Sequence, residues 1–247
     1  DDPFLETRAV LEKRNCQKGT VGLEKNANFL TPLQFEKLCN ILGPDRIKDC
    51  SGIVERVRMV KSDAELDIIR IAAKGTDRAM RAAYAEIKEG AVDHEIAAAV
   101  LAELARSGTE GISLYPMIAV GERSGVPHHS HDGVTVSEGD LIFLEFSPAI
   151  EWYHAPIMRS ATLGSVPEIA ARIADAGTAA LHAMCDTMKA GVPASTVAAA
   201  GKAEVDKVRD LVHFHDHYAY SVGIGFPPTW LESGFGILMN NHEPLQE

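Results

Sequence analysis

The chain contains two similar segments that lie far apart, and this internal repeat limits the folds that it can adopt. Residues 87–99 read IKEGAVDHEIAAA and residues 188–200 read MKAGVPASTVAAA, and the two align without a gap. Each segment joins the end of one long helical pattern to the start of a second. Alanine-rich stretches also match by chance, but the shared position at the joint between two helices favours duplication.

Helical and strand patterns follow the same order in both halves. Ser62-Asp-Ala-Glu65 is a capping box that opens an amphipathic helix to about Lys88, and a second helix is expected over residues 93–107. Strands are expected after each helix pair, over residues 111–120, 140–146 and 157–163 and then over residues 219–225 and 235–239. This order predicts a pseudo-symmetric α+β domain with a site between its halves.

The first 52 residues have the pattern of a small α/β unit. The expected elements are a helix over residues 6–14, a strand over 20–24, a helix over 32–42 and a short edge strand over 46–49. These elements are too few to cover both faces of a sheet. Either part of this unit precedes the chain, or the unit docks elsewhere.

Charge and composition argue against several classes of function. The formal net charge is −11 and no dense run of Lys and Arg occurs, so no nucleic-acid partner is expected, whereas a cationic or zwitterionic small molecule would suit the chain. The four cysteines show no paired spacing, so neither a disulfide framework nor a cysteine zinc site is indicated. No apolar run has the length of a membrane span and no signal-peptide pattern occurs, so a cytoplasmic protein is expected.

A single carboxylate interrupts an apolar run and is the strongest candidate for a chemical role. Glu145 lies within Leu141-Ile-Phe-Leu-Glu-Phe146, which has the composition of a buried strand. One explanation is a structural acid that a partner such as Arg159 on the next strand keeps ionised. The other is catalysis, because burial shifts the pKa of a carboxylate and can place it beside a substrate.

Four stretches carry a resemblance to a known family. The stretch GIVERVRMVKSDAELDIIRIAA, the segment around His128, the strand pair around Glu145 and the turn YSVGIGFPPTW resemble the pita-bread superfamily of creatinase, prolidase, aminopeptidase P and methionine aminopeptidase. The resemblance covers nearly the whole chain. It implies that residues 1–52 are the C-terminal portion of a creatinase-type α/β N-terminal domain, residues 53–61 a linker and residues 62–247 the pita-bread catalytic domain. It also implies a homodimer, and strands beyond Glu247 that carry two further acidic site residues.

The metallopeptidases of this superfamily hold two metal ions with two aspartates, one histidine and two glutamates. On the resemblance, Glu145 stands at the first aspartate position, Pro156 at the second and Val222 at the histidine. Proline and valine side chains carry no ligand atom, and a hard dication needs several oxygen or nitrogen donors. A dinuclear metal site is therefore not expected, and no cofactor is predicted.

A metal-free branch of the superfamily, which contains ectoine hydrolase beside creatinase, is similar in three strings. These are FLEF, YHAPIMRS and YSVGIGFPPTW, with departures from the branch's usual pattern at Ser147, Pro148, Trp152 and Thr229. The resemblance implies hydrolysis of a non-peptide C–N bond in a small zwitterionic compound, either an ectoine-like cyclic amidine or a creatine-like guanidine. The alternatives are an Xaa-Pro metallopeptidase and a catalytically inactive binding domain.

Two residues are the predicted catalytic pair. His128 stands at the offset of the creatinase-type acid/base histidine, and an imidazole can carry a proton in both directions near neutral pH. A surface loop, or an adventitious metal cluster with His129 and His131, is the alternative. Glu145 would either activate water or attack the substrate carbon directly.

Further residues are predicted to bind the substrate. Trp230 could cover a cationic ligand by cation–π contact or could simply pack in the core, and Glu232 could reach the same pocket or be solvated. One of Tyr153 and His154 is expected to hydrogen-bond the substrate, while the other packs. The predicted substrate-binding residues are Tyr153, His154, Arg159, Trp230 and Glu232.

Overall fold

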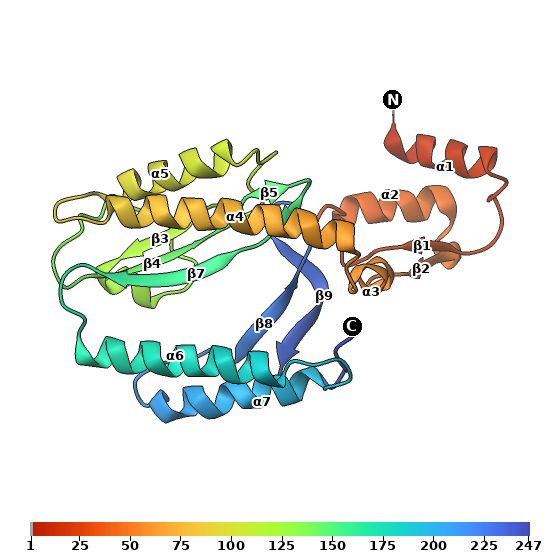
Figure 1. The fold of residues 1–247 in the computed structure, drawn as a ribbon. Coiled ribbons are helices and arrows are strands. Elements are labelled where there is room, and N and C mark those ends of the chain that lie inside the picture. The colour runs from red at the N-terminus through yellow and green to blue at the C-terminus, as the bar shows by residue number, and fades with distance from the viewer. Residues whose placement is uncertain (1) are drawn as a thin grey trace. The chain divides into compact units, whose positions relative to one another are not determined.

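Two stretches of the chain, Asp1–Arg58 and Met59–Glu247, form separate units in the computed structural model, which describes residues 2–247 apart from the side chain of Ser233. The assignment of these units to the predicted domains stays a prediction. Figure 1 shows the helices and strands of each unit.

The N-terminal unit is a two-stranded parallel sheet with helices. Its elements are α1 (Pro3–Lys13), β1 (Val21–Leu23), α2 (Pro32–Leu42), the 3₁₀ turn Pro44–Arg46, β2 (Ile47–Asp49) and α3 (Ile53–Arg58). Thr31 and Gln34 form a capping box that starts α2. Leu38, Leu42 and Ile47 are the buried centre of this unit. The segment expected to be only a connector contains the short helix α3.

The first half of the larger unit is a helix pair packed on a three-stranded antiparallel sheet. Its main elements are α4 (Asp63–Glu86), α5 (Asp93–Arg106), β3 (Met117–Val120), the 3₁₀ turn Gly121–Gly125, β4 (Leu141–Phe146) and β7 (Ile157–Thr162). The strand order is β3-β4-β7, so β4 is central. Apolar residues of α4 and α5, including Met80, Ile96 and Val100, pack against Leu144 and Phe146. β3 is shorter than the expected strand because residues 111–116 are irregular.

The second half repeats this order. Its elements are α6 (Glu168–Thr187), α7 (Ala194–Val205), the 3₁₀ turn Asp206–Val208, β8 (His217–Val222) and β9 (Leu231–Leu238). β8 and β9 pair in antiparallel fashion, and Ile237 of this sheet packs against Met184 and Val197 of the helices. Figure 1 shows α4 and α5 on the sheet of the first half, and α6 and α7 beside β8 and β9. β9 begins several residues before the expected strand.

The two similar sequence segments have the same backbone geometry. Gly90 and Gly191 both have a positive φ, of 80° and 83°. The Gly90 N–H donates to the Val136 carbonyl and the Gly191 N–H to the Leu245 carbonyl, each at 2.9 Å. Glycine suits both turns because its left-handed conformation costs little. The sequence repeat therefore corresponds to a structural repeat.

A short hairpin between β4 and β7 makes hydrogen bonds to the second half of the larger unit. β5 (Ala149–Ile150) and β6 (Tyr153–His154) form it, and both turn residues, Glu151 and Trp152, have a positive φ. The His154 N–H donates to the Gly223 carbonyl at 3.1 Å, and the Gly225 N–H donates to the Trp152 carbonyl at 3.0 Å. The segment after β8 is thereby held beside β6. Within residues 2–247, no helix is both long and apolar enough to span a bilayer.

Candidate active site

Glu145 lies on the face of the first sheet that is turned away from α4 and α5. Its directly opposite neighbours are Met117 in β3 and Met158 in β7, and such pairs share one face of an antiparallel sheet. The residues before and after it, Leu144 and Phe146, point into the helical core. Because successive side chains of the strand point to opposite faces of the sheet, the Glu145 carboxylate lies outside the apolar core.

The Glu145 carboxyl group is nonetheless buried and incompletely hydrogen-bonded. The residue is 4% exposed, and its Oε2 atom has no hydrogen-bond partner within residues 2–247. Burial raises the pKa of Glu145, and the nearby charge of His128 lowers it in part. A buried carboxylate with an open lone pair and a raised pKa is suited to accept a proton or to attack a carbon atom.

His128 lies in an exposed loop that follows the 3₁₀ turn Gly121–Gly125. Its φ is 63°, a left-handed conformation in which histidine is enriched among non-glycine residues. The side chain is exposed, and its charge acts on the Glu145 carboxyl group. The catalytic roles of the two residues stay a prediction.

Arg159 does not neutralise Glu145. It lies opposite Leu144 in the register of β4 and β7, which places it on the other face of the sheet from Glu145. It is exposed, and its guanidinium donates to the Met158 carbonyl at 2.7 Å. The alternative of a structural ion pair between these residues is wrong, because one position along a strand reverses the face. The predicted role of Arg159 in substrate binding stays a prediction.

His154 is fully buried in β6. It is 0% exposed. Burial lowers the pKa of His154, and the backbone groups of Gly223 and Trp152 beside the ring raise it in part. The ring is therefore neutral near pH 7.

Tyr153 makes a hydrogen bond that ties β6 to the start of α4. Its hydroxyl donates to Glu65 Oε1 at 2.9 Å, and Glu65 also accepts from the Ser62 N–H in the capping box. These bonds lower the pKa of Glu65. Of the two candidates in β6, Tyr153 thus has a structural contact with Glu65, while His154 is fully buried; which of them binds the substrate stays a prediction.

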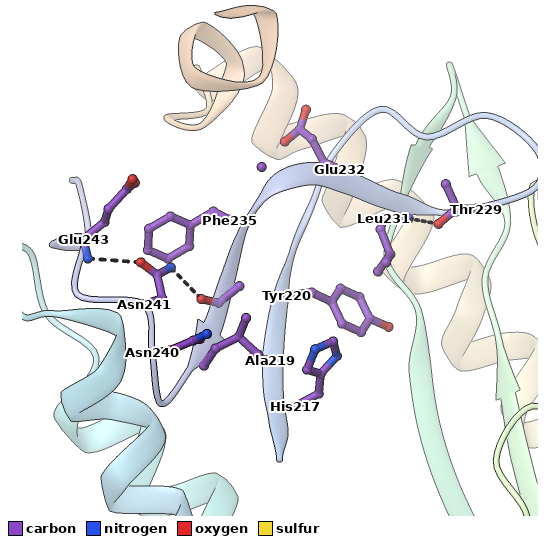
Figure 2. A pocket seen from close by; sticks show the side chains of 13 residues that line it. His217, Ala219, Tyr220, Thr229, Leu231, Glu232, Phe235, Asn240, Asn241 and Glu243 are labelled. Carbon is purple, nitrogen blue, oxygen red and sulfur yellow. Dashed lines mark hydrogen bonds between the residues drawn. The ribbon is translucent and has the colours of Figure 1, made fainter. Parts of the chain in front are cut away.

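A cavity of about 550 Å³ opens on the second sheet (Figure 2). Tyr220, Thr229, Glu232 and His217 are among its lining residues. Trp230 lies next to this lining and is 2% exposed, so it packs in the core rather than covering the cavity as an open wall. The cavity is large enough for a small organic ligand.

Glu232 forms a buried ion pair with Lys61. The side chains are 4% and 9% exposed, and the Lys61 ammonium also donates to the Met59 carbonyl at 3.2 Å. The Ser221 hydroxyl donates to the Glu232 carbonyl at 2.7 Å, which anchors the start of β9 to β8. Glu232 is therefore not solvated, and its charge is compensated within the fold.

The absence of a side chain at Gly223 makes room for the Glu232 carboxylate. A Cβ atom at Gly223 would lie 2.5 Å from Glu232 Oε2. Gly223→Ala is expected to lower the free energy of unfolding by about 1–3 kcal/mol, measured by urea denaturation. Gly177→Ala is the control, because nothing lies within 4 Å of the Cβ position at this glycine of α6. Equal effects of the two substitutions would contradict the close approach.

The residues at the expected metal-ligand positions do not form a metal site. Pro156 and Val222 offer no donor atom. Among the side chains described, no group of three or more His, Cys, Asp or Glu is arranged to hold a metal ion. The residues present therefore do not fit a dinuclear centre.

Two residues near the site were not predicted from the sequence. The sequence could have indicated Tyr220, because it lies two positions before Val222, which stands at the family's histidine position. Alternate residues of a strand commonly share one face. Lys61 gave no such signal, since it precedes a helix N-cap in a segment without periodicity. Its partner Glu232 is 171 positions away.

The paired helices, the two antiparallel sheets and the hairpin that joins them define a pita-bread hydrolase fold. An Xaa-Pro dipeptidase from Bacillus anthracis superposes with a TM-score of 0.87 at 19% identity, over 99% of this chain and 66% of that one. An X-Pro aminopeptidase from Thermotoga maritima gives a TM-score of 0.82 at 22% identity, over 100% and 68%. The expected fold class is confirmed.

Residues 67–247 match the model of metallopeptidase family M24, and the chain belongs to this family. Ectoine hydrolase from Halomonas elongata is 25% identical in an alignment of 252 positions that covers 97% of this chain and 62% of that protein. Xaa-Pro dipeptidase from Pyrococcus furiosus is 26% identical over 210 residues, with coverage of 83% and 57%. The chain spans less than two thirds of the length of either relative.

Proposed function

We propose that the chain is a metal-independent hydrolase of a non-peptide C–N bond in a small zwitterionic compound. An ectoine-like cyclic amidine is the first candidate and a creatine-like guanidine the second. The observation that carries the proposal is the buried Glu145 carboxylate, which has a raised pKa and an open lone pair. The residues Pro156 and Val222 support it, because they carry no donor atom at two positions where the resemblance expects metal ligands. A cytoplasmic homodimer belongs to the same proposal.

The chemistry follows from Glu145 and His128. In the general-base version, a water oxygen bonds to the amidine carbon, one water proton passes to Glu145, and the C=N electron pair moves onto nitrogen. The C–N bond then breaks with its electron pair on nitrogen, and His128 carries the proton held by Glu145 to that nitrogen. The remaining hydroxyl proton passes to the released amine as the carbonyl forms. The products are an amide and an ammonium group.

Glu145 could also act as the nucleophile. Its carboxylate oxygen would then bond to the amidine carbon, and the C–N bond would break with its electron pair on nitrogen, which takes a proton from His128. Water would next add to the Glu145 carbonyl carbon and give a proton to His128, which releases the amide and restores the Glu145 carboxylate. Both versions use the same two residues. Hydrolysis in ¹⁸O-labelled water under single-turnover conditions distinguishes them, because only the nucleophilic version transfers label into the Glu145 carboxylate.

The experiment that tests the proposed function compares substrates and metal dependence. The full protein is expected to hydrolyse ectoine or creatine, with products identified by NMR, and an excess of chelator should leave the rate unchanged. The reason is that the site residues present supply too few donors for a hard dication. Cleavage of an Xaa-Pro dipeptide that is lost with chelator and restored by Mn²⁺ would overturn the proposal.

The second candidate is an Xaa-Pro metallopeptidase. The observation in its favour is that the dipeptidase relative is as similar to this chain as the ectoine hydrolase is, at 26% and 25% identity. A third outcome, binding of these compounds without any turnover, would indicate an inactive binding domain. Calorimetry with ectoine, creatine and a proline dipeptide, together with product analysis, separates the three outcomes.

A further inference from the structure

The register of the first sheet determines which side chains lie beside Glu145. Met117 of β3 and Met158 of β7 are its direct cross-strand partners, so all three side chains lie on one face of the sheet. Direct partners in an antiparallel sheet have Cβ atoms about 5 Å apart. A substrate whose reacting carbon meets the Glu145 carboxylate therefore lies within reach of two thioether side chains.

The two methionines differ in how much of their surface is open. Met117 is 4% exposed and Met158 is 54% exposed, although Glu145 between them is buried. Met158 lies on β7, which is an outer strand in the order β3-β4-β7. Of the two methionines, only Met158 thus offers open apolar surface to a ligand beside Glu145.

The backbone of Met158 is fixed relative to Glu145, whereas its side chain is adaptable. The register of β4 and β7 is unbroken from Leu141 to Phe146. The Met158 carbonyl also accepts a hydrogen bond from the Arg159 guanidinium at 2.7 Å. An unbranched thioether has three rotatable bonds and fits apolar groups of different shapes. The sheet therefore holds an adaptable apolar side chain next to the acid.

Both candidate substrates carry a methyl group close to the carbon that is attacked. In ectoine the methyl group is bonded to the amidine carbon itself, and in creatine it is bonded to a nitrogen of the guanidine. When the reacting carbon meets Glu145, the methyl group enters the surroundings of this acid. A methyl group gains free energy when it leaves water for contact with an apolar side chain.

We propose that Met158 is a specificity-determining residue, whose thioether packs against a methyl group at or next to the reacting carbon of the substrate. This inference rests on the proposed function and narrows its substrate class to amidines and guanidines that carry a methyl group at this place. Met158 takes no part in proton transfer or bond formation. Its contact is the same in the bound substrate and in the transition state, so it lowers KM and leaves kcat unchanged.

The test compares each compound with the analogue that has hydrogen in place of the methyl group, which for creatine is guanidinoacetate. The measured quantity is the ratio of the two kcat/KM values in the full protein. Because the two compounds also differ in intrinsic reactivity, the change of this ratio on substitution decides the point. We expect Met158→Gln, which keeps the length of the side chain but is polar, to lower the ratio by about 10-fold through a higher KM for the methylated compound. Met158→Leu, which stays apolar, should keep the ratio.

Met188→Gln is the matched control for this substitution. Met188 is 43% exposed and follows the last residue of α6. The same change of a thioether to an amide at this place should leave the ratio and both kcat/KM values as in the wild type. Thermal unfolding of each variant checks that the fold is retained. Should Met158→Gln not fold, Met158→Thr takes its place, because threonine is polar and suits a strand.

The outcomes separate this inference from the proposed function. If the wild type hydrolyses neither ectoine nor creatine, the proposed function fails and this inference falls with it. If the wild type is active and Met158→Gln leaves the ratio unchanged, or lowers both kcat/KM values equally, Met158 does not select the methyl group while the proposed function stands. An equal loss of the ratio in Met158→Leu and Met158→Gln would also overturn the inference, because leucine keeps the apolar contact.

Discussion

Glu145→Gln is expected to lower kcat for the hydrolysed compound by about 10⁴-fold while the fold is retained. Glutamine has nearly the same shape, but its amide can neither accept a proton at neutral pH nor attack an electrophilic carbon. The measurement is product formation by NMR, with thermal unfolding of both proteins as the check on folding. A variant that turns over at the wild-type rate would remove Glu145 from the mechanism.

The same substitution is expected to stabilise the protein at neutral pH. Burial raises the pKa of Glu145 in the folded state, so the ionised carboxylate opposes folding. The contribution of Glu145 to stability is therefore fully present below the ordinary glutamate pKa of 4.5 and is lost as pH rises through the higher folded value. The glutamine variant lacks this loss, so its unfolding midpoint should exceed that of the wild type at pH 7, and the difference should shrink toward pH 4.

Exposed Glu89 is the control for this pH dependence, and Glu89→Gln should show no comparable gain. A structural acid would behave in the opposite way, because removing a carboxylate from a compensated pair lowers stability. A lower unfolding midpoint for Glu145→Gln at pH 7 would therefore favour a structural role. Gain of stability together with loss of turnover is the pattern expected when a strained group is retained for function.

Lys61→Met is expected to lower the free energy of unfolding by about 3–5 kcal/mol. The Lys61 ammonium and the Glu232 carboxylate are 9% and 4% exposed, so the substitution removes the cation from a carboxylate that water reaches poorly. Breaking a buried pair is costly because the remaining charge is left in a poorly solvated position. Urea denaturation at pH 7 is the measurement.

An exposed pair on α4 provides the matched control. Arg70 and Asp67 are 2.7 Å apart and 65% and 70% exposed, so Arg70→Met should cost at most about 1 kcal/mol. The double variant Lys61→Met/Glu232→Gln removes both charges and should recover part of the loss. If Lys61→Met costs no more than Arg70→Met, the buried pair does not stabilise the start of α4 against β9.

Local patterns were sufficient for much of the fold. The repeat at Gly90 and Gly191 predicted two equivalent helix joints, because glycine in a left-handed turn and the helix starts that follow are properties of a few adjacent residues. The apolar composition around Glu145 likewise predicted a buried strand with one carboxylate. The sequence also showed that Pro156 and Val222 carry no metal-ligand atom, because the resemblance to the family supplied the positions of the expected ligands.

The surroundings of the carboxylate depended on the tertiary structure. The register of β4 and β7 places Arg159 away from Glu145, and a shift of one residue would have reversed this result. Tyr153 and Glu65, and also Lys61 and Glu232, meet across long stretches of chain that no local period connects.

Sequence patterns therefore identified the repeated helix–strand order and the acid at the centre of the first sheet. The tertiary structure determined which groups surround that acid. The physical reason is that secondary structure follows from neighbouring residues, whereas pairing and charge compensation depend on strand register and on contacts between distant segments.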